Sequence, residues 1–137
     1  FATVFLGILD TRSGSLKYIN CGHITPMVVT DRGLKRKLTL TGPALGAIPD
    51  PDYQTDSIVL QPGDLVYAYT DGLSDAVNLN NESFNVNDLL PLLSSGQSLV
   101  NLCPIIHQRV EDFSAGTKQF DDITMLTVRR KPLVDHS

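Results

Sequence analysis

The chain has 137 residues, of which 42% are hydrophobic and 19% are charged. This size suits one domain of roughly 100–150 residues, and the apolar content excludes wholesale disorder. The formal net charge of −4 lacks the basic excess that binding to phosphate backbones requires, so we expect no nucleic-acid partner.

No apolar run approaches the roughly 20 residues that span a bilayer, so we expect no membrane contact from this segment. The two cysteines, Cys21 and Cys103, follow no metal-binding spacing. We expect two ordinary buried thiols and a cytoplasmic location.

The first half of the chain has the alternation and composition of short strands. The strands that we expect cover residues 2–9, 15–20, 27–30, 34–40, 53–60 and 65–69. We expect the first four to form a β-meander, interrupted by the irregular segment from Cys21 to Pro26. A loop rich in glycine and proline follows at 41–52.

Helical spacing of apolar residues begins only after residue 84. It predicts one helix over 85–93 and a second over about 98–113, with a kink at Pro104 or a true start near Cys103. A last strand is expected over 123–130, and residues 131–137 are expected to form a tail. Strands followed by helices and a closing strand indicate an α+β fold with mainly antiparallel sheets.

Asp71 is the first candidate site residue. An apolar strand leads to it through Thr70, and Gly72 follows in what we expect to be a tight turn. A sheltered carboxylate at a strand end is costly unless a cation or hydrogen bonds compensate it. An ordinary Asp-Gly turn, in which the aspartate bonds its own backbone, is the alternative at this position.

Asp121 and Asp122 form the second candidate, where the last strand begins. Adjacent carboxylates repel each other, and hard cations such as Mg²⁺ and Mn²⁺ choose oxygen ligands. A strand start with no metal is the alternative here. His23 lies in the irregular loop and fits either a general acid or a structural residue. The Gly-x-Ser-x-Gly pattern of a serine nucleophile is absent.

Six short motifs, taken in order, resemble the PP2C-like bacterial serine phosphatases of the stage II sporulation protein E and sigma-B regulator type. The motifs are Phe5-Leu6-Gly7-Ile8-Leu9-Asp10, Tyr18-Ile19-Asn20-Cys21-Gly22-His23, Gly42-Pro43-Ala44-Leu45-Gly46, Leu60-Gln61-Pro62-Gly63-Asp64, Tyr69-Thr70-Asp71-Gly72-Leu73-Ser74-Asp75-Ala76 and Phe120-Asp121-Asp122-Ile123-Thr124. Each motif alone is weak, but their order and spacing are specific.

The resemblance implies a PP2C-like β-sandwich flanked by helices, with a two-metal centre of Mn²⁺ or Mg²⁺. It implies hydrolysis of phosphoserine or phosphothreonine by a metal-activated water, with no protein nucleophile. Asp71 and Asp121 would be metal ligands. Gly72, Asp122 and Thr124 would support them. The substrate would be a phosphorylated regulatory protein, similar to an anti-anti-sigma protein, in a signalling or sigma-factor pathway.

The chain also departs from the family pattern, because the Gly-Asp-rich metal motif of the family has no counterpart here. We therefore expect residues 1–130 to be the C-terminal part of a phosphatase domain whose N-terminal part is absent. We expect this segment to be inactive alone. Its bare strand faces would allow it to form a homodimer. Asp75 stands where the family usually has glutamate. The alternative is a non-catalytic, phosphatase-like regulatory or interaction module.

Overall fold

The computed structural model of the chain describes residues 1–118 and 122–132. Its elements are β1 (Val4–Leu9), β2 (Ser15–Cys21), β3 (Met27–Thr30), β4 (Gly33–Lys37), β5 (Asp56–Val59), β6 (Leu65–Tyr69), α1 (Asp71–Ser74), the 3₁₀ helix η1 (Val86–Leu89), α2 (Leu90–Leu93), α3 (Leu99–Phe113) and β7 (Met125–Arg129). The strands expected from the sequence are present, most of them shorter at their ends.

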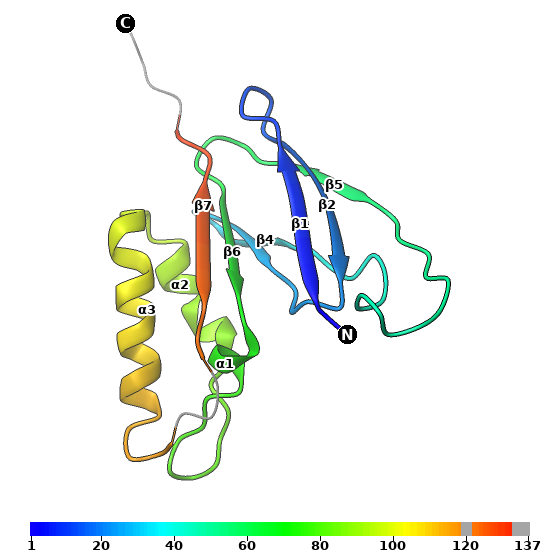
Figure 1. The fold of residues 1–137 in the computed structure, drawn as a ribbon. Coiled ribbons are helices and arrows are strands. Elements are labelled where there is room, and N and C mark those ends of the chain that lie inside the picture. Colours follow the sequence, from blue (N-terminus) through cyan, green and yellow to red (C-terminus); the bar gives the residue numbers. More distant parts are fainter. Residues whose placement is uncertain (119–121, 133–137) are drawn as a thin grey trace, which may run out of the picture.

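The strands form two antiparallel sheets. One has the order β1-β2-β5 and the other the order β4-β3-β6-β7. The four-stranded sheet lies between the three-stranded sheet and the helices α2 and α3 (Figure 1). The α+β sandwich with flanking helices that the sequence predicts is therefore confirmed.

The predicted meander is wrong, because the chain changes sheets after β2. β1 pairs with β2, and β3 pairs with β4 and β6, but β2 and β3 lie in different sheets. The crossing uses residues 22–26, the same irregular segment that interrupts the sequence pattern. Gly22 has φ +76°, a left-handed conformation that favours glycine and turns the chain out of β2.

Strand β6 is buried on both faces, which explains its continuous apolar sequence. Leu65 and Tyr67 belong to the cluster that the helices cover, whereas Val66 belongs to the cluster between the two sheets. β3 divides in the same way, with Met27 and Val29 toward the helices and Val28 toward the other sheet. Strands β3 and β6 therefore contribute side chains to both hydrophobic cores.

Helix α3 covers the four-stranded sheet with Leu102, Ile106 and Val110, which recur every four residues and are buried. The helix begins at Leu99 and continues through Pro104, so the alternative start near Cys103 is wrong. The expected helix over 85–93 is present as two short pieces, η1 and α2. The Asn85 side chain caps η1 by accepting a hydrogen bond from the backbone N–H of Asn87 at 3.0 Å.

The sandwich is open along one side, between the edge strands β1 and β7. The side chains of Ile8 and Leu126 on these strands are 72% and 61% exposed. Between the strands lies an apolar groove of about 350 Å³, whose walls include Phe5, Leu16 and Val128. No helix within residues 1–118 and 122–132 has the length and apolar character needed to cross a membrane.

Candidate metal centre

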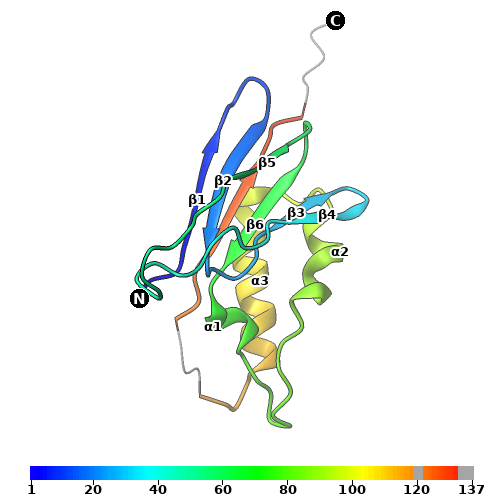
Figure 2. The ribbon, with the colours of Figure 1, turned by 90° about the vertical axis from the view of Figure 1, so that its right-hand side faces the viewer.

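The candidate site lies at the end of the sandwich where β6 finishes. Strand β6 ends at Tyr69, Thr70 has the extended backbone of a helix N-cap, and Asp71 opens the one-turn helix α1. Figure 2 shows α1 below β6, at the same end of the molecule as the N-terminus. The sequence predicted a tight turn here, and the structure has a short helix instead.

The residues after Asp71 hold the short helix in place. Gly72 is buried, and Leu73 is fully buried in the core cluster beneath the helices. Leu73 thus anchors α1 while Asp71, on the other side of the turn, remains exposed. Within the described residues the Asp71 carboxylate has no hydrogen-bond or ion-pair partner, because only the Asp71 carbonyl accepts bonds, from Asp75 and Ser74.

Thr70 joins this helix start to the segment that enters β7. The Thr70 backbone N–H donates to the Thr124 carbonyl at 3.0 Å, and the Thr124 N–H donates to the Thr70 hydroxyl oxygen, also at 3.0 Å. The same hydroxyl donates to the Asp122 carbonyl at 3.3 Å. These contacts extend the β6–β7 pairing past the last ladder pair, Tyr69–Met125.

The structure thus brings Asp71 and the segment 122–124 to one place, although 51 positions separate Asp71 from Asp122 in the numbering. Asp122 is exposed, and Thr124 supports the junction through its backbone. Asp121, the second expected ligand, lies outside the described residues, as does Phe120. The sequence reasoning missed the linking role of Thr70, whose only signal was its place between a buried strand and an aspartate.

A cavity of about 350 Å³ opens beside this junction, between β1 and the ends of β6 and β7. Its walls include Val4 and Phe5 from β1, Tyr69 and Thr70 from the end of β6, Thr124, and His23 from the crossing loop. The Tyr69 ring stacks on Tyr67 on the helix side of β6, and burial raises the pKa of its hydroxyl.

The donors at the junction suit a hard divalent cation, since carboxylates and carbonyl oxygens are the ligands that Mg²⁺ and Mn²⁺ prefer. Within the described residues no group of three or more His, Cys, Asp or Glu side chains could hold a metal. The described part of the chain therefore offers the free carboxylate of Asp71 as one ligand, and fits a centre completed by other groups or by water.

Comparison with known proteins identifies the class. The solved SiaA-PP2C domain of Pseudomonas aeruginosa superposes with a TM-score of 0.76 at 25% identity, over 93% of this chain and 51% of that chain. The phosphatase domain of the cell fate determinant SpoIIE from Bacillus subtilis, presoaked with Mn, has the same fold, with a TM-score of 0.68 at 19% identity over 98% of this chain and 59% of that one. The fold is that of a PP2C-type phosphatase domain.

The family model for Stage II sporulation protein E (SpoIIE) matches residues 1–131, and the chain belongs to this family. Protein IcfG of Synechocystis sp. is 38% identical over 131 residues, which are 95% of this chain and 21% of IcfG. The chain thus spans about a fifth of this relative and about half of the solved SiaA-PP2C domain. The family that the sequence motifs predicted is confirmed.

Proposed function

We propose that this chain forms part of a metal-dependent protein serine/threonine phosphatase, in which Asp71 and Asp121 are ligands of a Mn²⁺ or Mg²⁺ centre. The observation that carries the proposal is the Thr70 junction, which binds the residue directly before Asp71 to the Asp122–Thr124 segment. When bound, the metal would supply a nucleophile from water and stabilise charge on the phosphoryl group.

The residues of this chain would act by positioning the metal ligands. Leu73 and Gly72 fix the turn that presents Asp71, and Thr70 and Thr124 fix its separation from the β7 segment. Asp122 supports that segment through its carbonyl. A ligand held on packed secondary structure keeps its position better than one on a free loop, and the geometry of a metal site depends on that position.

The rest of the centre would come from outside this segment. In this proposal residues 1–130 are the C-terminal part of a phosphatase domain, residues 131–137 are a tail, and the segment alone is inactive. The proposal is supported by the half-length match to the SiaA-PP2C domain and by the small number of ligands within the described residues. The open edges of β1 and β7 are where further strands, or a second copy in a homodimer, would pair.

The substrate in this proposal is a phosphoserine or phosphothreonine of a regulatory protein, similar to an anti-anti-sigma protein. The support is membership of the SpoIIE family, and a solved SpoIIE phosphatase domain is described as that of a cell fate determinant. A non-catalytic, phosphatase-like binding module is the second candidate, favoured by the lack of a three-ligand cluster within the described residues.

The test is turnover of a phosphoserine peptide and of p-nitrophenyl phosphate by the full-length protein with Mn²⁺. Asp71→Asn and Asp121→Asn are each expected to lower kcat/KM by about 100-fold or more, since a metal site contributes several kcal/mol to the transition state. Asp31→Asn, a matched charge change in the exposed β3–β4 turn, should leave turnover unchanged. A metal-loaded full-length protein with no activity would support the binding module instead.

A further inference from the structure

The loop that crosses between the sheets holds His23 in a fixed place. The His23 backbone N–H donates to the Asn20 side-chain oxygen at 2.9 Å. Asn20 is itself fully buried, and its side-chain N–H donates to the Leu38 carbonyl at 2.9 Å. Gly22, between them, packs so closely that a Cβ there would lie 3.0 Å from the Ala44 Cβ. The loop is therefore tied to the sandwich at and before His23.

The imidazole ring is oriented as well. Its Nδ1 lies 2.7 Å from the Ile24 carbonyl oxygen. A carbonyl oxygen can only accept, so Nδ1 must carry the proton of this bond, and Nε2 is the nitrogen left for another partner. His23 is half-buried and is one of the residues that line the cavity next to Thr70 and Thr124.

His23 also differs in chemistry from the other residues that line this cavity. Of the described residues lining the cavity, His23 alone has a side chain that can carry a positive charge. The other lining residues are apolar, aromatic or hydroxyl-bearing, and Asp71 directly follows Thr70 of this lining. A phosphoryl group entering this space needs a hydrogen-bond donor, and an imidazolium N–H gives a short, charge-assisted bond to such an oxygen.

We propose that His23 contacts the substrate in the cavity beside Thr70 and Thr124. In the complex both ring nitrogens carry protons: Nδ1–H donates to the Ile24 carbonyl, and Nε2, protonated as the substrate binds, donates a hydrogen bond to a phosphoryl oxygen. This inference rests on the proposed phosphatase function and adds a substrate-binding group to it.

The kinetic test uses the full-length protein with Mn²⁺ and compares His23→Ala and His23→Gln with the parent. His23→Ala is expected to raise both KM and the inhibition constant for inorganic phosphate about tenfold, the size of one charge-assisted hydrogen bond, with kcat little changed. Gln carries an N–H near the Nε2 position, so His23→Gln should restore part of the affinity. The control is His107→Ala, on the exposed side of α3, where His107 lies 3.5 Å from Glu111.

Two kinetic outcomes would overturn the inference. Unchanged KM and unchanged phosphate inhibition in both variants would make His23 structural. A loss of kcat on the phosphoserine peptide but not on p-nitrophenyl phosphate, with phosphate inhibition unchanged, would make His23 a proton donor to the leaving oxygen, because only the poorer leaving group needs that proton.

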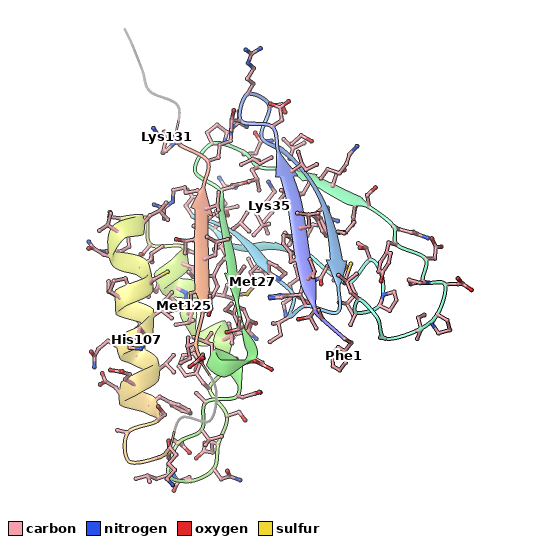
Figure 3. All side chains as sticks on the ribbon, viewed as in Figure 1. Phe1, Met27, Lys35, His107, Met125 and Lys131 are labelled. Atoms are coloured by element: carbon pink, nitrogen blue, oxygen red, sulfur yellow. The ribbon has the colours of Figure 1, made fainter. Side chains whose placement is uncertain are left out.

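A second readout needs no metal and no turnover. In long-range ¹H–¹⁵N NMR spectra of the metal-free full-length protein, the His23 ring is expected to show the Nδ1–H form, and its Nε2 signal should shift as inorganic phosphate is added. His107 lies on α3, beyond the four-stranded sheet from Phe1, and serves as the internal control (Figure 3). Equal shifts at both histidines would contradict the inference. If the parent protein has no phosphatase activity, the proposed function is refuted. The NMR titration alone then decides whether His23 binds phosphate.

Discussion

Thr70 and Thr124 hold each other through a reciprocal pair of hydrogen bonds, each 3.0 Å long, in which one uses the Thr70 N–H and the other the Thr70 hydroxyl oxygen. The pair continues the β6–β7 ladder beyond its last residues and binds the start of α1 to the entry of β7. In the proposed centre, the separation between Asp71 and the Asp121–Asp122 segment depends on this pair.

The first prediction concerns Thr70→Val, which keeps the shape of the side chain and removes its hydroxyl. The Thr124 N–H and the Asp122 carbonyl lose their partner, so the free energy of unfolding is expected to fall by about 1–2 kcal/mol. The affinity for Mn²⁺ should fall by about 10-fold, as expected when a group that orients a ligand is removed.

Urea denaturation and calorimetric Mn²⁺ titration of the full-length protein measure both quantities. Thr39→Val, at an exposed position after β4, is the matched control and should change neither. An affinity loss in Thr70→Val no larger than in Thr39→Val would show that the junction does not position the ligands.

The second prediction concerns Tyr67, a fully buried tyrosine of β6 in the core beneath the helices. Its hydroxyl has no hydrogen-bond partner within the described residues, and burial raises its pKa far above the usual range. An unpaired buried hydroxyl costs about 1–3 kcal/mol, so Tyr67→Phe is expected to raise the free energy of unfolding by about 1 kcal/mol.

Thermal and urea denaturation check this expectation, with Tyr53→Phe as the control, because Tyr53 is only partly buried and lies in the loop before β5. A lower stability of Tyr67→Phe would mean that the hydroxyl has a partner in solution.

The third prediction concerns Gly22→Ala, in the loop that crosses between the sheets. The left-handed backbone at φ +76° and the contact with Ala44 both oppose a Cβ, so a loss of about 1–3 kcal/mol in unfolding free energy is expected. Gly96→Ala is the control, because Gly96 has the same φ, +76°, but a Cβ there would meet nothing within 4 Å.

The difference between the two variants therefore isolates the crowding at Ala44. Equal destabilisation would attribute the whole effect to backbone strain and would remove the evidence that the loop is packed tightly around His23.

The sequence was informative where local pattern and packing agree. Strand β6 has the predicted bounds, because a run buried on both faces is apolar throughout and ends at a polar residue. The meander was wrong because alternation shows which face of a strand is buried, not which sheet it joins. The bend after β2 depends on the contact of Gly22 with Ala44, which is 22 positions later in the chain.

The site was predictable in part for a similar reason. Motif order indicated Asp71 and the Asp121-Asp122 pair, and family membership followed from the same motifs. The short helix at Asp71 was missed, because its formation depends on the burial of Leu73 against the helices and not on local propensity. The role of Thr70 depends on a strand pairing between residues 54 positions apart.

The most direct test of the central claim is a calorimetric titration of the full-length protein with Mn²⁺, carried out on the parent and on Asp71→Asn, Asp121→Asn and Asp31→Asn. If Asp71 and Asp121 are metal ligands, their variants should bind Mn²⁺ at least about 10-fold more weakly, or with the loss of one bound ion, while Asp31→Asn matches the parent. Isotherms of Asp71→Asn that coincide with those of the parent would contradict the claim and remove Asp71 from the metal centre.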